Sequence, residues 1–200
     1  MTFEHLLAFN LALFAAIASP GPALLVAIRT TLSSGRRAGI AMGAGLGLVA
    51  ALWTLAALLG LETIFTLFPW AYTTAKIGGA LYLLYIAYKM WVGARQAVTA
   101  TNKPTSQAFR QGLTINLLNP KSVLFAAAVL IVIFPANMTL SENIVIVFNH
   151  LLVEIAFYTL LAAVMSTPAV SEKYLRAKVY IDRVAAGILG LLGVRLIIDR

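Results

Sequence analysis

Three side chains in the C-terminal half of the chain could bind and release protons at one place. Glu154 lies in an apolar stretch, between Val153 and Ile155. An ionised carboxylate in such a stretch costs about 3 kcal/mol or more unless it is paired, protonated or turned toward a cavity. His150 and Tyr158 stand one helical turn to either side, so all three share one face of a helix. We expect this face to line an interior site at which Glu154 exchanges protons; the alternative is a satisfied polar cluster that joins helices.

Two proline motifs interrupt other apolar stretches of the chain. They read Ser19-Pro20-Gly21-Pro22 and Asn116-Leu117-Leu118-Asn119-Pro120-Lys121. Proline interrupts the hydrogen bonding of a helix and leaves backbone groups that lipid cannot satisfy. Such breaks are tolerated at membrane depth where they face protein or a water-filled cavity. Two of them in one chain are typical of a transporter that binds its substrate near the middle of the membrane.

The first motif predicts a site for a carboxylate. Pro20 and Pro22 lack amide donors, so the carbonyl of Ala16 loses its helical partner. Gly21 allows a ligand to approach the backbone closely. The helix that begins after Pro22 has partial positive charge at its N-terminus, which suits the carboxylate of an amino acid. We therefore expect the segment from Ser19 to Pro22 to bind the substrate.

The second motif offers amides and a cation. Asn116 and Asn119 are three residues apart, so their side chains project together and can cap the broken helix or bind polar groups of a ligand. Pro120 and Lys121 follow directly, and we expect all four residues to contribute to substrate binding. Lys121 is the natural opposite charge for Glu154, but its long side chain could instead extend to the membrane surface. Both arrangements of Lys121 stay open at this point.

Six long apolar stretches must position these residues. The chain is 61% apolar and 11% charged, with a mean hydropathy of +0.91, whereas a globular domain is about 45–50% apolar and about 25% charged. Each stretch has the roughly 20 residues that a helix needs to cross a bilayer. The sequence predicts an all-α integral membrane protein with six transmembrane helices, of which the first and fourth are broken. The expected spans are about 5–28, 39–61, 70–92, 111–134, 144–167 and 179–198.

The net charge of +8 arises mainly from basic residues in alternate connections between the apolar stretches. Arg and Lys gather around Arg36, Lys103 and Lys178, whereas the two intervening connections carry only Glu62 and Glu142. Basic residues mark cytoplasmic loops. We therefore expect both termini outside, a retained first span rather than a cleaved signal, and contact with anionic lipid rather than nucleic acid.

The expected spans divide into two halves of three spans each within one transmembrane domain, 1–200, although the two halves match only weakly in sequence. A polar stretch at about 93–110 is the expected cytoplasmic linker between halves of three spans each, about 1–92 and 111–200. Because three is odd, the second half enters the membrane from the opposite side, which predicts an inverted repeat. On the second span, Gly39, Gly43 and Gly47 form a stripe that lets another helix approach closely. We expect that stripe to pack within the chain, with a homodimer contact as the alternative.

Several classes of chemistry are absent from the sequence. There is no cysteine, which excludes disulfides and thiolate metal sites. The two histidines, His5 and His150, make a histidine metal site improbable, and no glycine-rich phosphate loop is present. No serine has an evident base partner. We expect no metal, no other cofactor and no enzymatic activity.

Four sequence elements together resemble the LysE/RhtB family of bacterial amino-acid exporters over essentially the whole chain. They are the two proline motifs, the glycines from Gly39 to Gly47, and Gly79-Ala80-Leu81-Tyr82-Leu83. The resemblance implies export of amino acids or derivatives, of the lysine and arginine or the homoserine and threonine type, across the bacterial inner membrane. Family members often carry an acid in the fifth span, where Glu154 matches. Ala87 stands where many members have a glycine. We expect this departure to affect the packing of the helix more than the class of protein to which the chain belongs.

Three functions remain as hypotheses. The first is a secondary exporter of amino acids driven by the proton gradient. The second is a passive channel or facilitator, which needs broken helices but no titrating carboxylate, so that neutralising Glu154 would matter little. The third is a non-transporting accessory subunit, against which the polar residues Lys121, Glu154 and Asn119 count because such a protein needs no polar interior.

Overall fold

The computed structural model of the chain describes residues 1–18, 21–60, 67–95, 103–135 and 138–198. Ser19 and Pro20, two of the expected binding residues, lie outside the described residues. In the described ranges, all regular secondary structure is helical, and short turns or loops join the helices. The helices are α1 (Phe3–Ala18), α2 (Pro22–Leu58), α4 (Pro69–Gly93), α5 (Thr105–Leu117), α6 (Pro120–Ile133), α7 (Leu140–Met165) and α8 (Pro168–Ile198).

Both proline motifs end one helix and begin the next. α2 and α6 each start on a proline, at the position where a missing amide costs no hydrogen bond and the fixed φ suits a helix. α2 also bends sharply at Gly35, which has φ 84° and ψ 173°. A positive φ favours glycine because it has no Cβ. Residues 22–34 of α2 therefore continue the course of α1, and residues 36–58 return beside them.

The fourth pass begins earlier than the sequence predicted. α5 starts at Thr105, inside the stretch of 93–110 that was expected to be linker. The reason is that hydropathy detects apolar runs, whereas α5 is an amphipathic helix whose first turns are polar. Likewise the first pass continues to residue 34, beyond the predicted boundary at 28. These corrections place each proline break near the middle of its pass.

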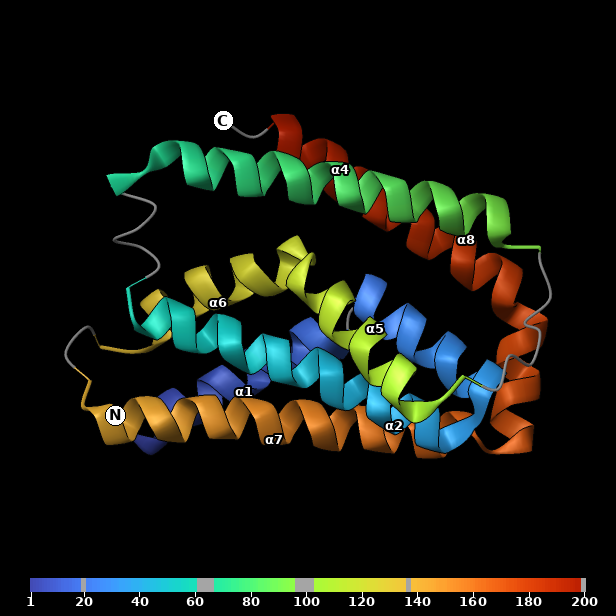
Figure 1. The fold of residues 1–200 in the computed structure, drawn as a ribbon, viewed down its shortest axis with the longest axis horizontal. Coiled ribbons are helices and arrows are strands. Elements are labelled where there is room, and N and C mark those ends of the chain that lie inside the picture. The colour runs from blue at the N-terminus through green and yellow to red at the C-terminus, as the bar shows by residue number, and fades with distance from the viewer. Residues whose placement is uncertain (19–20, 61–66, 96–102, 136–137, 199–200) are drawn as a thin grey trace.

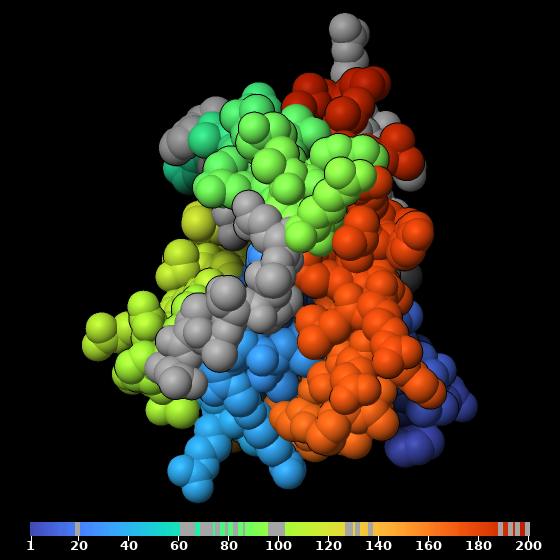
Figure 2. Space-filling model, turned by 90° about the vertical axis from the view of Figure 1, so that its right-hand side faces the viewer, coloured from blue at the N-terminus to red at the C-terminus, as the bar shows by residue number. Residues whose placement is uncertain are grey.

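The helices run back and forth along the long axis of the molecule (Figure 1). The kink in α2, the start of α5 and the turn between α7 and α8 lie at one end, on the right in Figure 1 and facing the viewer in Figure 2. These are the connections in which the sequence concentrates Arg and Lys. The start of α1, the end of α6 and the start of α7 lie at the opposite end (Figure 1).

By length and apolar composition, α2 and α7 are the two described helices that could each cross a membrane alone. α1, α5 and α6 have 16, 13 and 14 residues, fewer than the roughly 20 that a crossing needs. The proline breaks are the physical reason, because they divide two passes into short pieces. The count of six spans and the inverted repeat stay predictions.

The glycine stripe of α2 lies against α7. A Cβ added to Gly43 would overlap Tyr158, and one added to Gly47 would lie 2.8 Å from the Cβ of Glu154. A Cβ on Gly39 would lie 3.1 Å from that of Ala162. The stripe therefore brings the backbone of α2 directly onto the face of α7 that carries the candidate proton-binding residues.

A second glycine contact joins α2 to α5. A Cβ on Gly45 would overlap the carbonyl oxygen of Phe109, and one on Gly112 would overlap that of Met42. The contact is reciprocal, so the two backbones touch where the helices cross. α2 packs extensively on both α7 and α5, while α4 packs mainly on α8.

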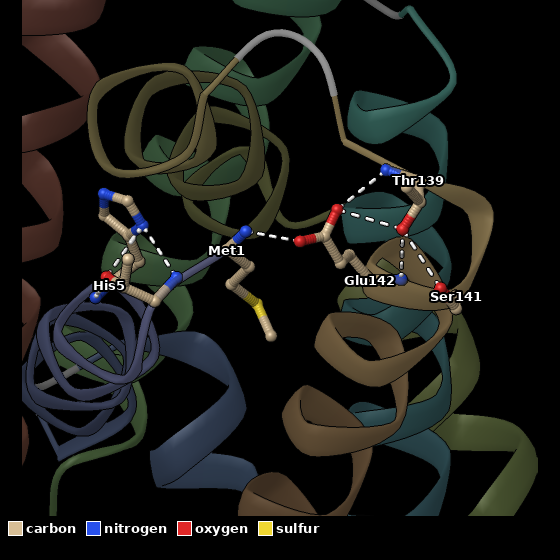
Figure 3. Close-up of polar contacts among 6 residues, drawn as sticks. Met1, His5, Thr139, Ser141 and Glu142 are labelled. Atoms are coloured by element: carbon tan, nitrogen blue, oxygen red, sulfur yellow. Dashed lines mark hydrogen bonds and ion pairs between the residues drawn. The ribbon is translucent and has the colours of Figure 1, made fainter.

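α1 is held more lightly, between α6 and α7 (Figure 1). Its first turn is fixed by the amino group of Met1, which contacts the carboxylate of Glu142 in the capping box that begins α7 (Figure 3). Farther along, Asn10 and Asn149 exchange amide hydrogen bonds of 3.3 and 2.7 Å. Phe9 and Leu13 are buried in the core. Polar contacts thus attach the first turns of α1 to α7.

Candidate functional site

The two breaks and the acidic face of α7 enclose one cavity. About 490 Å³ of space free of protein atoms lies between its walls, part of it open to solvent. The end of α1 and the first turn of α2 form one wall, the break between α5 and α6 another, and α7 the third. The predicted site residues that line it are Gly21, Asn116, Asn119, Lys121, His150, Glu154 and Tyr158.

The break between α5 and α6 is held by its own side chains. The Oδ1 atom of Asn119 accepts a hydrogen bond of 3.2 Å from the amide of Lys121 and so caps α6. The side-chain oxygen of Asn116 accepts from the amide of Asn119 at 3.4 Å and from the hydroxyl of Ser122. Asn116 also donates to the carbonyl of Leu46 on α2. Asn116 and Asn119 are therefore first of all structural, because their amides hold the broken segment in shape.

Lys121 joins the two breaks. Its Nζ atom donates a hydrogen bond of 2.6 Å to the carbonyl of Ala16, close to the end of α1. That carbonyl is the one which Pro20 deprives of a helical partner. The ammonium of Lys121 thus points inward and lines the cavity, rather than extending to the membrane surface.

The face of α7 forms the acidic wall of the cavity. Glu154 is 6% exposed, and its Oε1 atom lies 3.6 Å from Nε2 of His150. The Oε2 atom of Glu154 and Nε2 of His150 are both buried without a hydrogen-bond partner in the described part of the chain. Nδ1 of His150 is 2.7 Å from the hydroxyl of Thr54, which fixes the ring so that Nε2 faces Glu154. Unsatisfied polar atoms in an apolar interior are costly, so a hydrogen-bonding group placed in the cavity would stabilise both of these atoms.

Charge is separated across the cavity. The N-termini of α2 and α6 both reach it, through Gly21 and Asn119, and each carries partial positive charge. Lys121 adds a full positive charge on the same side, and Glu154 supplies the opposite charge on α7. The site is therefore complementary to a small molecule that carries both an anionic and a cationic group.

The structure separates Pro22 and Pro120 from the other predicted residues and adds several. Pro120 is buried as the first residue of α6 and lines neither this cavity nor the second one. Pro22 faces a different cavity, on the opposite side of α2. Thr54, which orients His150, lies seven residues after Gly47 on the same face of the helix. Following the face of Gly39, Gly43 and Gly47 along the sequence would therefore have identified Thr54 as a further site residue. Ser122 lies three residues after Asn119 and could have been found in the same way. In the described ranges of the chain, no three His, Cys, Asp or Glu side chains gather as metal ligands.

The comparisons with known proteins agree with this architecture. Residues 14–200 match the family described as LysE type translocator. The chain belongs to this family. The threonine efflux protein of Escherichia coli (strain K12) is 30% identical over 193 residues, which cover 92% of this chain and 93% of that protein. The homoserine/homoserine lactone efflux protein of Salmonella typhimurium (strain LT2) is 28% identical over 163 residues, which cover 80% of this chain and 79% of that protein. No solved structure matches the chain at a significant level.

Membership of the family settles the broad class of this LysE type translocator. It is a membrane transport protein and not an enzyme. The sequence resemblance to exporters of amino acids is thereby confirmed at the level of the family.

Proposed function

We propose that this translocator exports a small zwitterionic amino acid of the threonine or homoserine type, driven by the proton gradient. The observation that carries the proposal is the cavity, which unites two helix N-termini, Lys121 and the unpartnered oxygen of Glu154. The relatives are named as efflux proteins for threonine and for homoserine and its lactone. In our proposal the substrate carboxylate lies at the N-terminus of α2 near Gly21, and its ammonium contacts Glu154.

Charge favours a neutral amino acid over lysine or arginine. Glu154 is the one carboxylate among the described residues that line this cavity, whereas Lys121 stands close by with a positive charge. A second cation on the substrate would find no further acid and would be repelled by Lys121. A zwitterion matches the cavity charge for charge.

The arrangement of helices supports six passes in two inverted halves. Each half consists of a broken pass followed by two long helices: α1 and the first part of α2, then residues 36–58 and α4; and α5 with α6, then α7 and α8. The basic connections share one end of the molecule (Figure 1). We propose that this end is cytoplasmic and that both termini are outside.

Glu154 is the proposed coupling residue. In our scheme, the substrate ammonium and a proton compete for its carboxylate, so that protonation from outside releases the substrate. His150 lies 3.6 Å away and shares the proton. Tyr158 lines the cavity on the α7 side and packs against Gly43 of α2.

The test is the substitution Glu154→Gln, which imitates the protonated carboxyl at nearly constant shape. We expect the variant to exchange threonine but to lose uphill efflux driven by a pH gradient. The measurement is efflux of labelled threonine from loaded proteoliposomes, with and without the gradient. Glu172→Gln, an exposed carboxylate on α8, is the matched control and should behave as wild type. Gradient-driven efflux that survives in Glu154→Gln would favour a passive channel or facilitator, or another coupling site.

A further inference from the structure

A second cavity lies on the other side of the first turns of α2. About 440 Å³ of space free of protein atoms, part of it open to solvent, lies between walls that come from α2, the end of α4 and the start of α8. Gly21, Ala23 and Leu24 face the first cavity, whereas Pro22, Leu25 and Arg29 face the second. The broken helix start is therefore a thin wall between two cavities.

This second cavity contains a buried ion pair. Nζ of Lys178 is 2.6 Å from Oδ2 of Asp182, one helical turn farther along α8. Lys178 also donates to the carbonyl of Ala94 at 2.9 Å and to that of Gly93 at 3.5 Å. All three donors of the Lys178 ammonium are thus used, and the residue caps the C-terminus of α4.

Asp182 and Arg29 keep binding capacity toward the cavity. The Oδ2 atom of Asp182 accepts from Lys178, while within the described ranges Oδ1 takes no hydrogen bond. The guanidinium of Arg29 makes no hydrogen bond or ion pair with any described residue. Tyr174 lines the same cavity and is close enough to both residues to interact with them electrostatically. Because Lys178 already neutralises Asp182, Arg29 leaves this cavity with a net positive charge, which suits the carboxylate of an amino acid.

The cavity lies toward the end of the molecule that we propose to be cytoplasmic. Arg29 belongs to the last turns before the kink at Gly35, and Tyr174 follows the turn between α7 and α8. Both of these connections are at the end shown in Figure 2. A substrate that leaves the cytoplasm would meet this cavity before it reaches the cavity beside Glu154.

We propose that the second cavity is a cytoplasmic access site, in which Arg29 binds the carboxylate of the amino acid before transfer past the first turn of α2. The inference rests on the proposed export of a zwitterionic amino acid. It assigns to Arg29 a specific task, beyond the general role of loop cations in orienting the chain. The phosphate of an anionic lipid could satisfy the same guanidinium, and the experiment distinguishes the two sources of anion.

The test compares Arg29→Gln with Arg36→Gln in inside-out membrane vesicles, where export appears as uptake of labelled L-threonine. Arg29 and Arg36 are both exposed, but Arg36 lies outside both cavities. Arg36→Gln therefore removes the same charge from the same end of the molecule without changing the cavity. For Arg29→Gln we expect KM to rise about tenfold, as for a lost charge-assisted hydrogen bond, with the maximal rate nearly unchanged. Arg29→Lys should recover part of the affinity, and Arg36→Gln should keep the wild-type KM.

Two further arms make the assignment specific. L-threoninamide lacks the carboxylate, so its potency as a competitor should be the same against wild type and Arg29→Gln. In proteoliposomes of phosphatidylcholine alone, the KM difference between wild type and Arg29→Gln should persist. A difference that arises only when phosphatidylglycerol is added would assign Arg29 to lipid and overturn the inference.

The remaining outcomes separate the inference from the proposed function. Wild-type vesicles that take up neither threonine nor homoserine would contradict the proposed function and this site with it. Wild-type uptake together with an unchanged KM in Arg29→Gln would overturn the access site alone.

Discussion

The break between α5 and α6 is held by side chains of its own segment, whereas the break between α1 and α2 takes a donor from elsewhere. Asn119 caps α6, and Asn116 binds Asn119, Ser122 and the backbone of α2. At the other break, Gly21 caps α2 without a side-chain bond, and the carbonyl of Ala16 accepts from Lys121. Among the described residues, the second break is thus held by nearby side chains, whereas the carbonyl of Ala16 at the first break accepts a hydrogen bond from across the cavity.

The difference indicates which part of the transporter is fixed. The second break is anchored to α2 through Asn116 and through the glycine crossing of Gly45 and Gly112. α1 is held by a few polar contacts and by Lys121. Phe9 and Leu13 of α1 are also buried in the core, but within the described residues α1 makes no close backbone crossing like that of α2 with α5. We therefore expect α1 to move against a rigid unit of α2, α5 and α7 when the cavity changes its access. The predictions below test this division, beginning with the rigid unit.

Gly112→Ala should have the largest effect on stability. Its Cβ would overlap the carbonyl of Met42, a backbone atom that cannot turn away. Overpacking of this kind costs about 3 kcal/mol, so we expect little folded protein. The measurement is the yield of monodisperse protein in detergent and its midpoint of thermal unfolding.

Gly78→Ala is the matched control for that substitution. A Cβ on Gly78 meets no atom within 4 Å, and alanine favours a helix over glycine by about 1 kcal/mol. Normal yield and unfolding temperature for Gly112→Ala would show that α2 and α5 can separate, and α5 would then not belong to the rigid unit.

Asn116→Ala should have the next largest effect. The substitution removes the side-chain donor to the carbonyl of Leu46, and it leaves the side-chain amide of Asn119 and the hydroxyl of Ser122 without this acceptor. Buried groups left unsatisfied cost about 1–3 kcal/mol. We expect a lower unfolding temperature and loss of transport together, because both depend on the shape of the break.

Leu117→Ala is the control for Asn116→Ala. Leu117 is the next residue of α5 and is exposed on the helix surface. An Asn116→Ala variant as stable as Leu117→Ala would mean that the second break is not held by this network, and the contrast between the two breaks would disappear.

The sequence was sufficient to predict what depends on local chemistry. Proline at positions 22 and 120 begins helices wherever the rest of the chain goes, and the spacing of His150, Glu154 and Tyr158 places them on one face whatever lies opposite. That His150, Glu154 and Tyr158 would share a cavity with the broken helices was also expected, because transporters of this kind bind their substrate at such breaks.

What the sequence could not predict depends on distant parts of the chain. The partner of Lys121 is a carbonyl 105 residues away, and only the packed arrangement of the helices selects it. Lys178 and Arg29 resembled charges that orient loops, because sequence does not show that α8 buries Lys178 against the end of α4. The early start of α5 was missed because its polar first turns lower the hydropathy of the window.

Lys121→Met should have the smallest effect on stability and still abolish transport. Removing the ammonium leaves the carbonyl of Ala16 without that donor, a loss of about 1 kcal/mol, since a typical hydrogen bond contributes that amount. Transport should fail because Lys121 also supplies the positive side of the cavity and holds the end of α1 to the second break. Lys121→Arg keeps the charge and the donors, so it should transport at a reduced rate, whereas Lys121→Met should be folded and inactive. The measurements are the unfolding temperature and threonine counterflow on the same preparations. Wild-type counterflow in Lys121→Met would show that the two breaks act independently, and the idea that one half supports the other would be wrong.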